Sequence, residues 1–148
     1  MRKIIIADTS CLIALTNVDL LPVLQSLYGQ IYITEEVNLE FGETLPEWII
    51  VLKVINQTKQ SEIAKKLDLG EASSIALALE FNHSILIIDE LKGRIIAQSY
   101  HIEIIGTLGV LLLASKRGFI PDLNQLLQKL KQNGFRISDD LINKLLSF

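Results

Sequence analysis

The sequence has one cysteine, three prolines and no Pro/Gly-rich linker. Cys11 cannot form an internal disulfide, and its apolar surroundings indicate a buried, reduced thiol in a cytosolic protein. We find no internal repeat and no low-complexity segment that would indicate an array or a flexible tail. These absences argue against a disulfide-stabilised secreted domain and against a string of linked domains.

Long hydrophobic runs are also missing. The run Ile4–Ala7 is interrupted by Asp8 and is too short for the core of a signal peptide. The longest apolar stretch near the other end, Leu108–Ala114, is far shorter than a membrane-spanning helix. We therefore expect a soluble, cytoplasmic protein without a membrane partner.

An excess of positive charge is absent as well, because the formal net charge is −3. Proteins that coat nucleic acid non-specifically need a positive surface, so this class is disfavoured. A nuclease is not excluded, since acidic residues can be neutralised by a metal ion. Aromatic residues make up 6% of the chain and are too scattered for a base-stacking platform.

Several common catalytic patterns do not occur. The segment after the first apolar run, Asp8-Thr9-Ser10-Cys11, is neither a phosphate-binding loop nor a dinucleotide fingerprint. His83 and His101 are isolated, and together with Cys11 they lack zinc-ligand spacing. No obvious base accompanies Ser10, which disfavours a catalytic triad.

Short β-branched runs alternate with longer helical patterns in a chain of 148 residues, of which 49% are hydrophobic. This length fits one domain, and continuous apolar strands suit a parallel sheet covered on both faces. The pattern predicts a three-layer α/β/α sandwich around a mainly parallel five-stranded sheet. The predicted strands are Ile4–Ala7, Ile31–Ile33, Ile49–Leu52, Ile85–Ile88 and Ile102–Ile105, and the predicted helices between them are Ser10–Leu27, Glu35–Gly42, Lys59–Leu67, Gly70–Asn82 and Leu91–Tyr100.

The last third of the chain is predicted to be helical. Leu108–Lys116 forms an apolar helix, and Pro121 can start an amphipathic one that ends at Gly134. Ser138 caps a final helix. We expect residues 1–148 to form one domain, with the helices of about 121–148 packed on it or on a partner.

Acidic residues end two of the predicted strands. Asp8 follows the first strand and Asp89 the fourth. The carboxyl ends of parallel strands share one sheet edge, so these side chains converge if the two strands are neighbours. Glu71 opens a helix pointing toward the same edge. Such oxygen ligands suit Mg²⁺ or Mn²⁺, which support phosphodiester cleavage.

Each acid also has a structural interpretation. Asp8 can cap the following helix, Glu71 is favourable at any helix N-terminus, and Asp89 can be a turn residue. A further acid, Glu40 or Glu36, lies in the helix after the second strand, where the two share one face. The ordered set is more specific than any single member.

Together these motifs resemble the PIN-domain family. The resemblance is to a subfamily with a Gly-Glu-Ala motif and covers essentially Ile4 to Gly118. The motifs that carry it are Asp8-Thr9-Ser10, Leu69-Gly70-Glu71-Ala72, Ile87-Ile88-Asp89, Asp89-Glu90-Leu91-Lys92-Gly93-Arg94 and Ile105-Gly106-Thr107.

The resemblance implies a Mg²⁺- or Mn²⁺-dependent endoribonuclease that leaves a 5′-phosphate and a 3′-hydroxyl. Many PIN domains are VapC-type toxins held inactive by an antitoxin protein, and such toxins are often homodimers. The implied metal-binding and catalytic residues are Asp8, Glu40 (with Glu36 as the alternative), Glu71 and Asp89.

Substrate-positioning roles are expected for Ser10, Lys92, Arg94 and Thr107. Thr107 also reads as a helix cap, and a solvated helix face is the alternative for Lys92 and Arg94. Two rival functions stay open. One is a non-catalytic PIN-like binding module that uses the late leucine-rich helices, and the other is an α/β phosphohydrolase acting on a small phosphoester.

Overall fold

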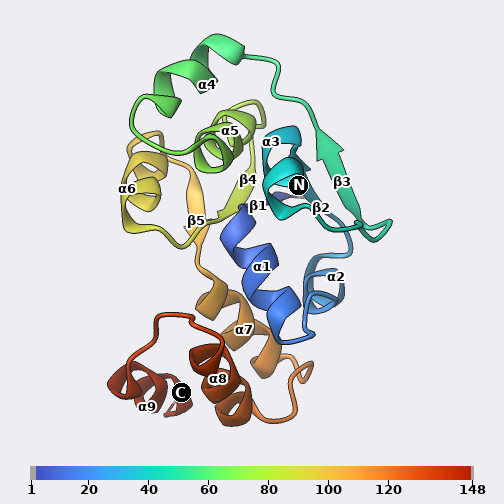
Figure 1. Cartoon of the computed structure of the whole chain (residues 1–148), viewed down its shortest axis with the longest axis vertical. Helices are drawn as coiled ribbons and strands as arrows, with labels where there is room; N and C mark the ends of the chain where they lie inside the picture. Colours follow the sequence, from blue (N-terminus) through green and yellow to red (C-terminus); the bar gives the residue numbers. More distant parts are fainter. Residues whose placement is uncertain (1–2, 148) are drawn as a thin grey trace.

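Figure 1 shows the computed structural model, which describes residues 3–147; residues 1, 2 and 148 of the predicted domain lie outside this range. Within it the chain forms five strands and nine helices. The strands are β1 (Ile4–Ala7), β2 (Ile31–Thr34), β3 (Ile49–Leu52), β4 (Ser84–Ile87) and β5 (Glu103–Ile105). The helices are α1 (Thr9–Asn17), α2 (Val23–Tyr28), α3 (Glu35–Phe41), α4 (Gln57–Ala64), α5 (Leu69–Ala78), α6 (Leu91–Ser99), α7 (Thr107–Lys116), α8 (Leu123–Gln132) and α9 (Asp139–Leu146).

The five strands form one parallel sheet in the order β3-β2-β1-β4-β5. This confirms the predicted sheet. The chain first builds outward from β1 to β2 and β3, and then returns to place β4 on the other side of β1. The strand order therefore reverses between β1 and β4, where Ala7 pairs with Ile87. A parallel sheet offers a ligand-binding crevice at the carboxyl ends of such strands.

Alternate residues of each strand face opposite helix layers, as the period of a β-strand requires. Ile5 and Ala7 of β1 belong to the core shared with α1, α2 and α7, whereas Ile6 belongs to the core shared with α5 and α6. Figure 1 shows α4, α5 and α6 in the upper part of the molecule, α1, α2 and α7 below them, and α8 and α9 at the lower end. The predicted α/β/α sandwich is thus confirmed.

The predicted helix Ser10–Leu27 is wrong, because the structure divides it into α1 and α2. The break contains Asp19, whose φ of 58° is left-handed and incompatible with a continuing helix. Pro22 then stands at the N-cap of α2, where a missing backbone N–H is tolerated. Apolar residues recur at helical spacing on both sides of this break, so the sequence pattern predicts one continuous helix.

Other boundaries differ by a few residues. Pro121 does not start the next helix: α8 begins at Leu123, where Asp122 caps the backbone N–H of Gln125 at 3.0 Å. The predicted cap at Ser138 is confirmed, since its hydroxyl accepts from the backbone N–H of Leu141 at 3.1 Å. The ends of the predicted helices near α4, α5 and α6 and of the strands β4 and β5 are shifted similarly.

The late helices contribute to the main hydrophobic core. Val110, Leu111 and Ala114 of α7 are fully buried, and Leu126, Leu127 and Leu130 of α8 join the same cluster. These apolar faces are therefore used in packing within the chain. Among the helices of residues 3–147, none is long and apolar enough to cross a membrane.

Candidate active site

Asp8 is buried at the carboxyl end of β1, next to the point where the strand order reverses. Its backbone N–H donates to Ile87 O at 3.0 Å, which continues the pairing of β1 with β4. The residue occupies the N-cap position of α1, but its side chain makes no capping hydrogen bond. The structural interpretation of this carboxylate as a cap therefore fails, and its side chain is 4% exposed.

The environment of Asp8 is strongly unfavourable to its charge. Burial raises the pKa of Asp8 to about 7, although the Thr9 backbone opposes this in part. The neighbouring charges of Asp68, Glu40 and Asp89 raise the pKa further. Three acids from other segments of the chain thus lie close enough to Asp8 to affect it at this edge of the sheet.

Asp89 follows β4 and is held by the start of α7. The backbone N–H of Thr107 donates to Asp89 Oδ1 at 2.7 Å, and the Thr107 hydroxyl donates to Asp89 Oδ2 at 2.5 Å. The helix cap is Gly106, so the prediction that Thr107 caps this helix is wrong. Thr107 is completely buried and fixes both oxygens of Asp89.

Glu71 lies in the first turn of α5, where Asp68 is the N-cap residue. Its backbone N–H donates to Asp68 Oδ1 at 2.8 Å. Burial, a side-chain hydrogen bond with Asp68 and the charges of Asp68 and Asp8 raise the pKa of Glu71 to about 8. Its Oε2 atom is buried without a hydrogen-bond partner within residues 3–147. Glu71 therefore has an unused acceptor oxygen beside Asp8.

Two glycines make room for these carboxylates. A Cβ atom at Gly93 of α6 would lie 2.9 Å from Glu71 Oε2, and one at Gly70 of α5 would lie 2.5 Å from Glu40 Oε1. Both distances are shorter than ordinary contacts. The glycines of the Gly-Glu-Ala and Asp-x-x-x-Gly-Arg motifs thus have a steric function at the acidic cluster.

The structure separates the two candidates for the remaining acid. Glu40 Oε2 accepts from the hydroxyl of Thr9 at 3.0 Å, directly beside Asp8 in the chain. Glu36 Oε2 instead accepts from Gln60 Nε2 of α4 at 2.6 Å. The geometry therefore places Glu40, and not Glu36, with Asp8.

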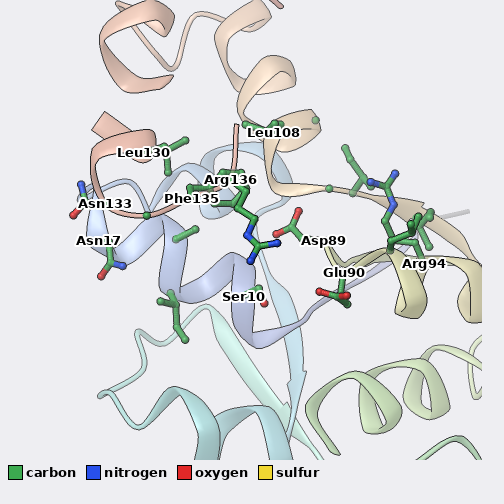
Figure 2. A pocket seen from close by; sticks show the side chains of 18 residues that line it. Ser10, Asn17, Asp89, Glu90, Arg94, Leu108, Leu130, Asn133, Phe135 and Arg136 are labelled. Atoms are coloured by element: carbon green, nitrogen blue, oxygen red, sulfur yellow. The ribbon is translucent and has the colours of Figure 1, made fainter. Parts of the chain in front are cut away.

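Two cavities border the acidic cluster and share Ser10 and Glu90 in their lining, whereas Asp8 and Glu40 line neither of them. The larger, about 890 Å³, is here called the Asp89 cleft; Figure 2 shows Asp89, Arg94 and Arg136 around it. The smaller, about 490 Å³, is called the Glu71 cleft. It is also lined by Lys65, Lys66, Asp68, Glu71 and Lys92. Of the predicted substrate-positioning residues, Ser10, Lys92 and Arg94 thus reach these cavities.

The donors present fit a small, hard divalent cation. Carboxylate oxygens are the ligands that Mg²⁺ and Mn²⁺ prefer. Burial without a counter-charge at Asp8 and the unpartnered Oε2 of Glu71 are both features that a cation would relieve. In the described part of the chain, however, no three acidic, histidine or cysteine side chains form a complete ligand group. The acidic side chains lie near one another but do not form a complete set of metal ligands in this conformation.

Three charged residues that line these cavities, among others, have no role in the motifs recognised from the sequence. Asp68 is one of them, and its spacing to Glu71, which is that of a capping box, indicates a helix N-terminus at this point. Glu90 is another, and only its position beside Asp89 hinted at a role. Arg136 is the third, and it reaches the cleft through the folding of the segment after α8.

Comparison with known proteins identifies the family. Comparisons with curated proteins and with solved structures give no significant match. A family model described as the PIN domain, a family whose members are generally nucleases, matches residues 4–148. This match covers nearly the whole chain and agrees with the parallel sheet. The chain belongs to the PIN domain family.

Proposed function

We propose that this protein is a Mg²⁺- or Mn²⁺-dependent endoribonuclease. The observation that carries the proposal is the buried Asp8 carboxylate, which makes no capping bond and lies where the strand order reverses. Its neighbours Asp68, Glu40 and Asp89 come from three other segments, and all are acidic residues that raise the pKa of Asp8. Such a concentration of charge disfavours folding and is typical of a functional site.

Asp8, Glu71 and Asp89 would hold the metal, directly or through water, and Glu40 would complete the set. When bound, the divalent ion lowers the pKa of a water molecule and stabilises the charge that develops on the phosphate. Thr107 keeps both oxygens of Asp89 in place. Because Thr107 is fully buried, we assign it this positioning role rather than the substrate contact that the sequence suggested.

The remaining polar residues would bind the RNA strand. Ser10 is exposed between the two clefts, where it can reach a phosphate next to the acids. Lys92 lines the Glu71 cleft and Arg94 the Asp89 cleft. Cationic groups on both sides of the acids can hold a polyanion in spite of the net negative charge of the protein.

Cleavage assays test this proposal. End-labelled RNA with both single-stranded and paired segments is incubated with Mn²⁺ or with a chelator, using the wild type and Asp8→Asn. We expect internal cuts with 5′-phosphate ends only for the wild type with Mn²⁺. Full activity of Asp8→Asn would refute the assignment. Hydrolysis of an aryl phosphate without RNA cleavage would favour the rival phosphohydrolase.

We further propose that the ribonuclease is the toxin of a cytoplasmic toxin–antitoxin pair, and that it works as a homodimer with an antitoxin as its protein partner. This biological role is supported by the family alone. Controlled expression of the wild type should stop bacterial growth, and expression of Asp8→Asn should not. Equal growth with both chains, at equal protein levels, would contradict the toxin role.

A non-catalytic binding module is the second candidate, and one observation favours it. Leu91 and Ile95, one turn apart on α6, are 70% and 57% exposed. Such a pair can contact a partner protein. Titration calorimetry with Mn²⁺ separates the two candidates. A binding module would show no Mn²⁺ site that depends on Asp8.

A further inference from the structure

The Asp89 cleft receives an arginine from a distant part of the chain. Arg136 lies between α8 and α9, more than 40 residues beyond the last proposed metal ligand. Figure 2 shows its side chain extending from the α8–α9 segment toward the space between Ser10 and Asp89. The C-terminal helices thus bring a positive charge to the edge of the acidic cluster.

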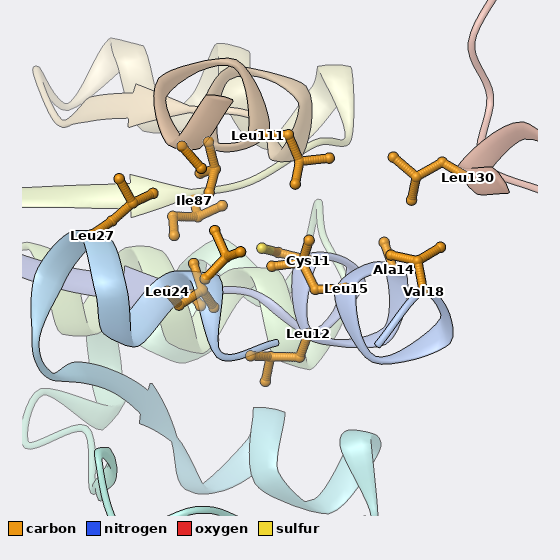
Figure 3. Close-up of a cluster of buried hydrophobic side chains, with 14 of the residues drawn as sticks. Cys11, Leu12, Ala14, Leu15, Val18, Leu24, Leu27, Ile87, Leu111 and Leu130 are labelled. Atoms are coloured by element: carbon orange, nitrogen blue, oxygen red, sulfur yellow. The ribbon is translucent and has the colours of Figure 1, made fainter. Parts of the chain in front are cut away.

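The backbone after α8 holds this arginine in place. Gly134, at φ 90°, ends the helix, and the backbone N–H of Phe135 donates back to Leu130 O at 3.0 Å. This arrangement is a Schellman motif, which reverses the chain after a helix. Leu130 and Ile137 are buried in the main core, and Figure 3 shows Leu130 on the side of α1 that carries Ala14 and Val18. The position of Arg136 is therefore built into the packing.

Within the described residues, the guanidinium group of Arg136 stabilises no other group of the protein. Among residues 3–147 its side chain makes no hydrogen bond and no ion pair, and the same holds for Arg94, which lines the same cleft. Asp89 accepts its hydrogen bonds from Thr107 and not from either arginine. Two guanidinium groups thus face one cavity with their donors unused.

The cleft also has apolar walls. Ile13 of α1, Leu108 of α7 and Phe135 contribute to its lining. Ile13 is 43% exposed and contributes an apolar surface to this cavity. A volume of about 890 Å³ lies within the usual range for organic ligands. Apolar walls with arginines at the mouth suit a nucleobase and its phosphate.

We propose that the Asp89 cleft is a nucleotide subsite of the RNA-binding groove, in which Arg136 and Arg94 bind the phosphate of the nucleotide next to the cleaved bond. This inference rests on the proposed ribonuclease function. It makes the α8–α9 segment part of the substrate-binding site rather than an appended support. It also gives Arg136 a function, although this residue is far in sequence from the acidic motifs.

RNA binding without cleavage tests the subsite. The probe is a fluorescein-labelled single-stranded RNA of twelve mixed nucleotides, measured by anisotropy with Ca²⁺ in place of Mg²⁺. Arg136→Ala should weaken binding by about tenfold, the loss typical of one charge-assisted contact. The slope of log affinity against log salt should fall by about 0.7, which corresponds to one lost phosphate contact on a single strand. Arg136→Lys should recover part of both.

Lys129→Ala is the matched control. Lys129 is an exposed cation on α8 that does not line the cleft, so its removal changes the net charge equally. We expect unchanged binding and salt slope for this variant. Thermal unfolding of Arg136→Ala should match the wild type, because its side chain makes no bond within residues 3–147.

The outcomes for the subsite and for the proposed function are distinct. If the wild type cleaves RNA but Arg136→Ala binds the probe with unchanged affinity and salt slope, the subsite is refuted and the ribonuclease assignment stands. If binding depends on Arg136 but the wild type never cuts RNA with Mn²⁺, the ribonuclease assignment is refuted, and the cleft stands as an RNA-binding site that uses Arg136 without a cleaved bond beside it.

Discussion

Thr107 donates to both carboxylate oxygens of Asp89, through its backbone N–H at 2.7 Å and its hydroxyl at 2.5 Å. The two residues are 18 positions apart and join the end of β4 to the start of α7. Asp89 is thereby oriented before any ligand arrives. A residue that orients a metal ligand in this way affects metal affinity without contacting the metal or substrate.

The role of Thr107 predicts a difference between two substitutions. Thr107→Val keeps the shape and the backbone bond but removes the hydroxyl, so Asp89 gains a rotational freedom. We expect Mn²⁺ affinity to fall about tenfold, the lower end of the effect of such outer-shell changes. Thr107→Ser should retain most of the affinity. Calorimetric titration measures both, and equal affinities for Val and Ser variants would show that the hydroxyl is not needed.

Gly93 predicts a steric effect on Glu71. A Cβ atom there would lie 2.7 Å from Ile88 Cδ1 and 2.9 Å from Glu71 Oε2. Gly93→Ala should therefore displace Glu71 and lower Mn²⁺ affinity, even though alanine favours the helix by about 1 kcal/mol.

Gly109→Ala is the control for crowding alone. Its Cβ would lie 2.8 Å from Ile105 Cγ1 and would meet no carboxylate. We expect this variant to bind Mn²⁺ like the wild type. Equal Mn²⁺ affinity of Gly93→Ala and the wild type would contradict the position assigned to Glu71.

The separation of Glu40 from Glu36 predicts unequal effects of two similar changes. Glu40→Gln removes a charge that lies near Asp8, and cleavage with Mn²⁺ should fall by at least about tenfold. Glu36→Gln alters a residue that pairs with Gln60 on α4, and its cleavage rate should stay within about twofold of the wild type. A larger loss for Glu36→Gln than for Glu40→Gln would reverse this assignment.

The raised pKa of Asp8 predicts how stability changes with pH in the metal-free protein. Unfolded Asp8 releases its proton near pH 4, whereas the folded protein keeps it up to about pH 7. Between these values the folded state binds more protons, so the free energy of unfolding falls as pH rises. Glu71, with a pKa of about 8, extends this fall to higher pH.

Asp8→Asn should therefore be more stable than the wild type at pH 8 in a chelator, by about 1–4 kcal/mol. Its stability should also depend less on pH between 4 and 7. Urea unfolding at several pH values measures both effects. A destabilised Asp8→Asn protein at pH 8 would mean that the folded state does not disfavour the Asp8 charge.

Local sequence patterns predicted most of the strands and helices because each strand is marked by its own short apolar run. The apolar runs before Asp8 and Asp89 are continuous, and both became strands of a parallel sheet. The break within Ser10–Leu27 was missed because it depends on Asp19 adopting a positive φ, for which an aspartate gives only a weak signal.

Residues of the candidate site could be predicted from the sequence only where they directly follow a strand or stand at the start of a helix. Arg136 carries no such local mark, since its place in the cleft depends on how α8 packs on α1 and on the turn at Gly134. The Gly-Thr motif marks Thr107 as a candidate, but the contact of Thr107 with Asp89 depends on the pairing of β4 with β5. Long-range packing decides both positions, and a single sequence does not display it.

The most direct test of the central claim is the anomalous scattering of Mn²⁺ in crystals of the wild-type protein. The account predicts a peak at the carboxyl ends of β1 and β4, bordered by Asp8 and Asp89 and reached by Glu71 directly or through water. The peak should be absent in Asp8→Asn crystals. Metal-dependent RNA cleavage together with an Mn²⁺ peak away from these carboxylates, and none beside them, would contradict it.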